Sequence, residues 1–251
     1  MSLEYLLTWL MVFFRSIGVV LLFPALTGRP LPVMARLGLC VCLATLLAGV
    51  VPPAVVLTHH WDLVVAVSGE VALGLTLGFV ARMAFAAVEM AGRIISSEIG
   101  LSATPGMGVP EPTSEPIAAI LNALAVVMFF LFGAHQLVLS AFVRSFFISR
   151  TGQPAFDPST VDSLIRATSH VIELGLRIAA PFIAMNFLAN LAFSVLGRAV
   201  PKMNVFIVSY SARAIAGLAL LSVAGTLIAR YLFVEFGNIA LQMLQVMPRG
   251  R

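Results

Sequence analysis

Residues 63–95 read LVVAVSGEVALGLTLGFVARMAFAAVEMAGRII, a stretch of 33 residues in which only four side chains are charged. A helix that crosses a bilayer needs ~20 mainly apolar residues, and this stretch exceeds that length. Five further stretches meet the same criterion. They are Tyr5–Leu26, Leu37–Leu57, Ile117–Ile148, about Val171–Leu196 and about Val205–Val234. The sequence therefore predicts an all-α, polytopic integral membrane protein with about six long, partly kinked helices.

The composition of the whole chain supports this fold class. Of the 251 residues, 60% are hydrophobic and only 10% are charged, whereas a soluble domain carries about 25% charged residues. One globule of this size cannot bury so many apolar side chains. The net charge of +4 comes from scattered residues and never from a basic run. A soluble enzyme, a disordered chain and a nucleic-acid-binding protein are therefore excluded.

Two connectors between the apolar stretches are rich in proline and glycine. Gly100–Pro116 reads GLSATPGMGVPEPTSEP, which cannot be helical or extended throughout. Thr151–Pro158 is a second turn-rich stretch, and an amphipathic segment, Ser159–Arg177, follows it. The apolar tail, Phe236–Met247, is predicted to form a separate short helix. No stretch resembles a soluble catalytic or ATPase domain.

Ionisable side chains lie inside the apolar stretches, where a charge at mid-membrane costs ~2.5–3.5 kcal/mol. They are Arg15, Glu70, Arg82, Glu89, Arg144, Glu173, Arg177 and Arg213. We expect most of them to face protein or a wet cavity. Arg82, Glu89 and Arg93 share one helix face, either as a salt-bridge ladder within the helix or as a stripe that faces another subunit. Glu173 and Arg177 have the spacing of an ordinary helical ion pair.

Gly74 and Gly78 are four residues apart, a spacing that lets two membrane helices approach closely. The pattern predicts tight helix packing at this point of the 63–95 stretch.

No arrangement of side chains indicates catalysis, a cofactor or a metal site. His59 and His60 lie beside Trp61 at the end of a segment, as expected of an interfacial belt, and His135 has no partner at metal-ligand spacing. Gly106-Met107-Gly108 lacks the further glycine of a dinucleotide-binding loop. We therefore expect no enzyme activity, no cofactor and no metal.

Several short motifs occur in a fixed order over about 200 residues. The first segment carries Arg15, then Pro24, Pro32 and Arg36. Glu70 is followed by Gly74, Gly78 and Phe79, and later by Ala91, Gly92, Gly100, Leu101 and Ser102. Phe129, Phe130, Phe132, Gly133 and His135 come next, and Asn190, Arg198, Pro201, Asn204 and Phe206 complete the set. In this order and spacing the chain resembles the R-type subunits of bacterial flagellar and virulence-type export gates, the FliR/SpaR/YscT family.

The chain departs from the family pattern at three places. Glu98 stands where relatives usually have glutamine, and Ser211 stands where a proline commonly follows the late motif. The Gly100–Pro116 loop has Met107 and Val109 where relatives often carry an aromatic residue.

The resemblance implies an R-type subunit built like a P-type subunit joined to a Q-type helical hairpin. Residues 1–165, with the loop 100–116, would be the P-like part, and residues 166–251 the Q-like hairpin. Such a subunit would assemble with P-type and Q-type subunits, a FlhB-like switch subunit and a FlhA-like export subunit. The assembly would stand in the bacterial inner membrane at the flagellar basal body and pass unfolded protein substrates.

The resemblance also assigns roles to residues. In the family the loop between the third and fourth segments plugs the channel, which here implies Thr104, Pro105, Gly106, Met107, Gly108, Val109 and Pro110. The residues expected to pack against partner subunits are Arg15, Glu70, Gly74, Gly78, Arg82, Glu89, Arg93, Pro201, Asn204, Phe206 and Arg213.

Two alternatives to a flagellar subunit remain at this stage. The first is the homologous subunit of a virulence injectisome, although the regular late motif favours the flagellum. The second is a small secondary transporter that would use Glu70 and Arg82 as a substrate or proton site, but such a transporter predicts paired hydropathy repeats that the sequence lacks.

Overall fold

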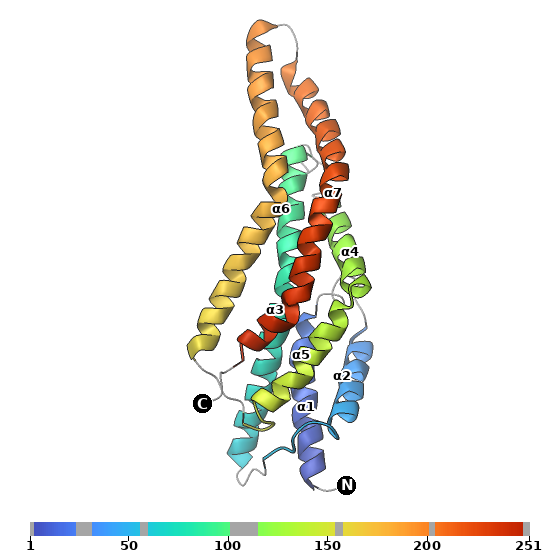
Figure 1. Cartoon of the computed structure of the whole chain (residues 1–251), viewed down its shortest axis with the longest axis vertical. Coiled ribbons are helices and arrows are strands. Elements are labelled where there is room, and N and C mark those ends of the chain that lie inside the picture. Colours follow the sequence, from blue (N-terminus) through green and yellow to red (C-terminus); the bar gives the residue numbers. More distant parts are fainter. Residues whose placement is uncertain are drawn as a thin grey trace. The chain divides into compact units, whose positions relative to one another are not determined.

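The computed structural model describes residues 3–23, 32–55, 60–100, 115–153, 158–200 and 204–247. In these ranges the chain forms helices and no strand (Figure 1), so the all-α prediction is confirmed. The helices are α1 (Leu3–Leu22), α2 (Val33–Leu47), α3 (His60–Ile99), α4 (Pro116–Leu131), α5 (Ala134–Ile148), α6 (Pro158–Ala199) and α7 (Val205–Gln245).

Four of these helices, α1, α3, α6 and α7, are long and apolar enough to cross a membrane, and α4 with α5 forms a fifth span if the pair is counted together. The predicted span Leu37–Leu57 is wrong, because α2 ends at Leu47 and has only 15 residues. Pro52 and Pro53 follow closely, and a proline removes a helix donor and restricts the residue before it. The helix therefore stops before it reaches membrane-spanning length.

Three further boundaries differ from the sequence prediction. The Ile117–Ile148 stretch is broken into α4 and α5 at Gly133, whose φ of 69° is left-handed and suits glycine. In contrast, the amphipathic segment Ser159–Arg177 and the predicted span at about Val171–Leu196 form one continuous helix, α6, despite Pro181 in its interior. The apolar tail continues α7 as far as Gln245, so the separate short helix is absent.

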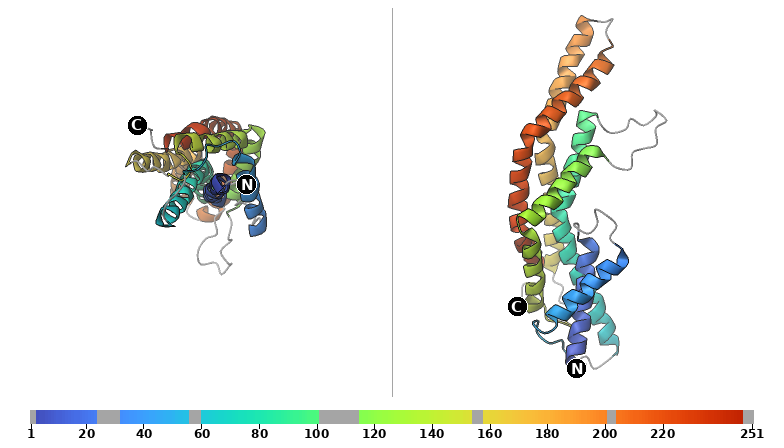
Figure 2. Two further views of the ribbon diagram at one scale, coloured as in Figure 1. Left: turned by 90° about the horizontal axis from the view of Figure 1, so that it is seen from below. Right: turned by 90° about the vertical axis from the view of Figure 1, so that its right-hand side faces the viewer.

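The helices pack into two compact units, each made from several stretches of chain. The first unit comprises residues 1–84, 130–169 and 236–251, and the second comprises residues 85–129 and 170–235. In the second unit α6 and α7 run side by side as a helical hairpin (Figure 2). The division into a P-like part and a Q-like part stays a prediction, because these units reflect contacts within the chain and not likeness to other subunits.

The core of the first unit is aliphatic and aromatic. Met11 from α1, Leu73 and Leu77 from α3, and Phe142 and Phe146 from α5 are almost fully buried. The short helix α2 lies against α1, where the indole Nε1 of Trp9 donates to Thr45 Oγ1 at 3.2 Å.

α1 and α3 approach each other most closely at glycines. A Cβ placed on Gly18 would lie 2.5 Å from the backbone nitrogen of Leu75, and one on Gly74 would overlap the carbonyl of Arg15. Gly78 faces the backbone of Val19 in the same way. The tight packing predicted at Gly74 and Gly78 is present, and the contacting helix is α1 of the same chain. Their packing against a partner subunit stays a prediction.

We expect Gly74→Ala to destabilise the protein by about 1–3 kcal/mol, because the added methyl group must push two helix backbones apart. Gly38→Ala is the matched control, since a Cβ on Gly38 in α2 meets nothing within 4 Å. Replacing a helical glycine that has open space around it stabilises by roughly 0.5–1 kcal/mol. Thermal unfolding of both variants in the same detergent measures the difference, and equal melting temperatures would contradict the close crossing.

Candidate functional site

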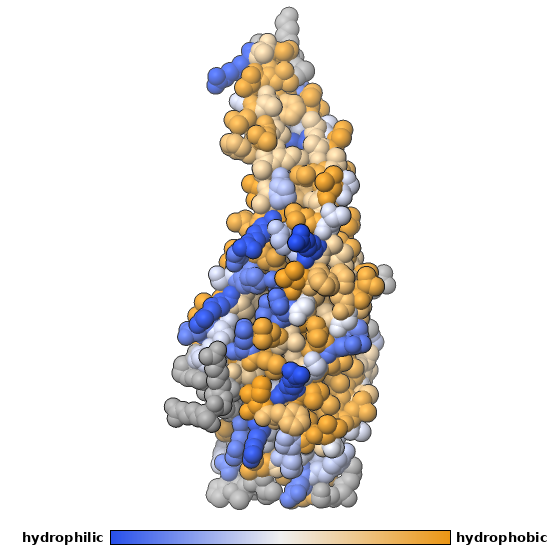
Figure 3. All heavy atoms as spheres, viewed as in Figure 1, coloured by the Kyte–Doolittle hydropathy of each residue, from blue (hydrophilic) through white to orange (hydrophobic). Residues whose placement is uncertain are grey.

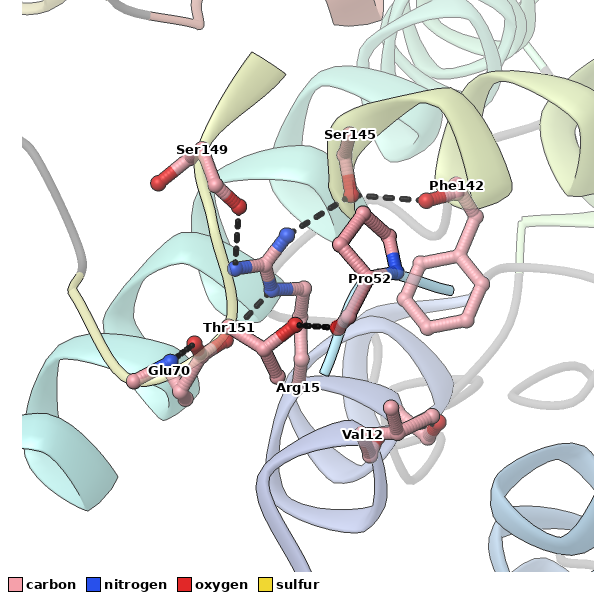
Figure 4. Close-up of polar contacts among 10 residues, drawn as sticks. Val12, Arg15, Pro52, Glu70, Phe142, Ser145, Ser149 and Thr151 are labelled. Atoms are coloured by element: carbon pink, nitrogen blue, oxygen red, sulfur yellow. Dashed lines mark hydrogen bonds and ion pairs between the residues drawn. The ribbon is translucent and has the colours of Figure 1, made fainter. Parts of the chain in front are cut away.

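A buried ion pair joins α1 to α3 in the first unit. Arg15 Nε donates to Glu70 Oε2 at 2.5 Å, and both side chains are 0% exposed. The two residues are 55 positions apart in the sequence. Figure 4 shows the guanidinium of Arg15 turned toward the chain around Ser145, Ser149 and Thr151.

The remaining donors and acceptors of this pair are satisfied by α5 and the turn after it. Arg15 Nη1 donates to Ser145 Oγ at 3.1 Å, and Nη2 donates to the carbonyl of Ser149 at 3.2 Å. The guanidinium also lies 4.1 Å from the ring centroid of Phe146. Glu70 Oε1 accepts the backbone N–H of Gly152 at 2.9 Å. Three helices and one turn therefore meet at this pair.

The turn that completes the pair is itself tied to the segment after α2. Thr151 Oγ1 donates to the carbonyl of Pro52 at 3.0 Å, and Thr8 Oγ1 accepts the N–H of Ala54 at 2.8 Å. Gly152 has a φ of 86°, a conformation that glycine adopts without strain and that aims its N–H at Glu70. Because a buried charge without a partner is very unfavourable, these bonds make the pair a structural requirement of the unit.

A second polar junction lies in the second unit, at the end of α3. Asn186 Nδ2 of α6 donates to Glu98 Oε2 at 2.5 Å, and Asn186 Oδ1 accepts from Arg213 Nη1 of α7 at 3.3 Å. An amide has a donor end and an acceptor end, so one side chain bridges a carboxylate and a guanidinium. Close helix contacts flank this junction, since Gly217 faces Ile99 and Gly92 faces Ala118.

Other charges pair on exposed helix faces. Glu89 and Arg93 are 2.7 Å apart and Glu173 and Arg177 are 2.6 Å apart, each with i,i+4 spacing. The ordinary helical pair predicted for Glu173 and Arg177 is therefore confirmed. Arg82 is exposed and forms no ion pair with the part of the chain that the structure describes. The salt-bridge interpretation thus fits Glu89 and Arg93, and Arg82 stands apart from it.

The other predicted site residues fall as follows. Thr104–Pro110 and Pro201 lie outside the described residues, as does the side chain of Phe206. Asn204 precedes α7, and its Oδ1 accepts the N–H of Ile207 at 3.5 Å. Arg15 and Glu70 contact groups of their own chain, and their role in subunit packing stays a prediction.

Sequence reasoning missed the groups that complete both junctions. Ser145, Ser149 and Gly152 bond to Arg15 or Glu70, and Asn186 bridges Glu98 and Arg213. The sequence indicated that buried charges need partners, but it did not indicate which residues those partners are. Among the described residues, no three His, Cys, Asp or Glu side chains gather as a metal site would require.

The exposed surface of α6 and α7 is strongly apolar. In the most apolar stretch of each helix only 17% of the residues are buried. Figure 3 shows apolar side chains over the paired ends of these helices, with few hydrophilic residues between them. Such a surface needs lipid or another protein to cover it.

Comparison with known proteins identifies one family and several relatives that cover most of this chain. The model of the family described as "Bacterial export proteins, family 1" matches residues 6–239. Flagellar biosynthetic protein FliR of Escherichia coli is 27% identical over 253 residues, which covers 98% of this chain and 97% of the relative. FliR of Caulobacter vibrioides is 29% identical over 85% of this chain and 86% of its own length. Yop proteins translocation protein T of Yersinia pestis is 29% identical over 86% of this chain and 85% of its own length.

We expect Arg15→Leu to destabilise the protein by about 3–5 kcal/mol, because Glu70 would be left as an uncompensated buried charge. The double variant Arg15→Leu/Glu70→Leu should recover part of this loss, since no charge remains buried. Arg93→Leu, which breaks an exposed pair, is the control and should cost less than about 1 kcal/mol. Equilibrium unfolding in detergent measures all three. A double variant no more stable than Arg15→Leu would show that Glu70 is not the group left uncompensated.

At the second junction, Asn186→Leu removes both the donor for Glu98 and the acceptor for Arg213. We expect a loss of about 1–3 kcal/mol in the free energy of unfolding. Asn190→Leu is the matched control one turn further along α6, because the bond that Asn190 donates to Asn186 is exposed. Glu98→Gln should be tolerated, since the glutamine oxygen can still accept from Asn186. If the two leucine variants melt together, the amide does not hold the junction.

Proposed function

The chain belongs to family 1 of the bacterial export proteins, and from this premise we propose that it forms an entry gate with P-type and Q-type subunits. Unfolded export substrates would cross the bacterial inner membrane through this gate, at the flagellar basal body. The protein is a membrane component of a bacterial export apparatus. Flagellar relatives from several genera favour the flagellum over an injectisome.

The observation that carries this proposal is the length of the exposed apolar helices. α3, α6 and α7 contain 40, 42 and 41 residues, so each is ~60 Å long at 1.5 Å per residue. The hydrocarbon core of a bilayer is only ~30 Å thick. Since α6 and α7 expose apolar side chains along much of their length, lipid covers only part of that surface. Partner subunits with matching apolar faces account for the rest.

Within the gate, residues Thr104–Val109 are proposed to close the channel, with Met107 and Val109 in apolar contact and Gly106 and Gly108 allowing movement. This role follows from the family resemblance. The described residues on either side support it, because the helices that flank the 101–114 segment are in backbone contact where Gly92 meets Ala118. The segment therefore leaves and re-enters the fold from two helices that are packed together.

The proposed gate carries out no chemistry of its own. An ATPase and the proton-motive force, acting through partners such as the FlhB-like and FlhA-like subunits, would supply the energy for export.

The secondary-transporter alternative requires Glu70 as part of a substrate or proton site, and the contacts of Glu70 argue against that role. Glu70 is fully buried, and its two oxygens already accept from Arg15 and from the N–H of Gly152. A substrate or proton would have to break the structural pair in order to bind there.

Co-expression with P-type and Q-type subunits tests the proposal. We expect a stable complex that survives affinity purification and size-exclusion chromatography, and the purified chain alone should show no transport. Deleting Thr104–Val109 should leave the complex intact and raise ion leakage across membranes that contain it. If the chain purifies alone in the presence of both partners, the proposal that it forms a gate with them is wrong. If the assembled deletion variant has unchanged conductance, the proposal that Thr104–Val109 closes the channel is wrong.

A further inference from the structure

A buried hydroxyl near the end of α3, in the second unit, makes no hydrogen bond. Ser96 is 0% exposed, and its Oγ has no hydrogen-bond partner among the residues that the structure describes. Ser16 and Ser145 are also fully buried helical serines, but each donates to a carbonyl of its own helix, at 2.7 and 2.6 Å. Because Ser96 does not use this local acceptor, its hydroxyl is left for another group.

A second buried polar atom without a partner lies at the start of α4. Glu115 is half-buried, its Oε2 is shielded from solvent, and this oxygen accepts no hydrogen bond within the described parts of the chain. Its backbone carbonyl accepts the N–H of Ala119 at 3.0 Å, so Glu115 is fixed to the first turn of the helix. A carboxylate oxygen that has neither solvent nor a donor is unfavourable.

The packing of α3 on α4 brings these two atoms to facing positions. A Cβ on Gly92 would overlap the backbone of Ala118, so the two helices touch there. The end of α3 lies beside the start of α4 (Figure 2). One turn beyond Gly92 in α3 is Ser96, and one turn before Ala118 is Glu115. Residues three or four apart share a helix face, so both side chains lie on the contacting faces.

The surroundings of the two atoms are apolar. Ile95 and Ile117, which are close to them in the sequence, are 0% and 2% exposed. Buried polar groups that the protein leaves unpaired are the groups that structural water molecules bind, typically through about three hydrogen bonds. A hydroxyl can donate or accept, a carboxylate oxygen accepts, and water does both. Ser96 and Glu115 therefore offer the chemistry of a site for water.

We propose that a buried water molecule bridges Ser96 and Glu115 and so bonds the end of α3 to the start of α4. The water accepts from Ser96 Oγ and donates to Glu115 Oε2. The chain between residues 100 and 115 starts and ends at these two helix ends, and the bridge keeps the ends together. The inference needs no partner subunit, so it is independent of the proposed gate.

The first test removes the hydroxyl from the full chain in detergent. Ser96→Ala should lower the melting temperature by about 2–4 °C, as expected for one lost hydrogen bond in a protein of this size. Ser97→Ala is the matched control and should change it less, because the hydroxyl of Ser97 is exposed and donates to the carbonyl of Ile94 at 2.7 Å. An unpaired buried hydroxyl is unfavourable, so an unchanged or higher melting temperature of Ser96→Ala would overturn the bridge.

The second test asks whether the two residues share one ligand. Ser96→Ala and Glu115→Leu each remove one side of the bridge, so the double variant should lose clearly less than the sum of the two single losses. Glu115→Gln keeps an acceptor oxygen and should melt close to the unmodified chain. Strictly additive losses would show that no molecule connects Ser96 with Glu115, and the proposal would be wrong.

The third test separates water from a cation, because carboxylate and hydroxyl oxygens also suit a small hard cation. The chain is melted in sodium chloride and in choline chloride at equal ionic strength, with a chelator of divalent ions in both. We expect equal melting temperatures. If sodium raises the melting temperature of the unmodified chain but not that of Glu115→Gln, the site holds a cation and the assignment to water fails.

Discussion

The fold of the first unit depends on one buried ion pair, Arg15 with Glu70. In a membrane, apolar side chains have little preference for one another over lipid, so apolar packing alone does not fix which helices meet or in which register. A charge that is excluded from lipid has a much stronger preference. Arg15 therefore selects α3, α5 and the turn at Gly152 as its neighbours, because each supplies a group that the guanidinium or its carboxylate partner needs.

The same combination of features recurs in the second unit. A polar bridge through Asn186 joins α3, α6 and α7, and small residues beside it let the backbones approach, as at Gly92 with Ala118 and Gly217 with Ile99. The polar contact fixes which helices pair, and the glycines allow them to come close enough for it to form. An outer surface rich in apolar side chains remains available for lipid and for other subunits.

How far the sequence predicts this structure depends on the distance over which each interaction acts. Local patterns were sufficient for the helical class, for the Glu173–Arg177 pair and for the close packing at Gly74 and Gly78. The partners of Arg15 lie 55 to 134 residues away and include a backbone carbonyl, and Glu70 accepts from a backbone N–H; such backbone groups leave no periodic trace. The break at Gly133 was missed because one glycine in a long apolar run resembles many that stay helical. The family resemblance rested on ordered motifs and is confirmed over residues 6–239.

The position of Arg15 near the start of the chain has a consequence for biosynthesis. Its carboxylate partner is 55 residues further on, and Ser145 is 130 residues further on. At a translation rate of ~5–20 residues per second, the ribosome adds Glu70 about 3–11 s and Ser145 about 7–26 s after Arg15. The first helix thus enters the membrane with a charge whose partners do not yet exist. Before α3 and α5 have been made, the cost of placing this charge in lipid is not offset by the contacts that stabilise it in the folded protein.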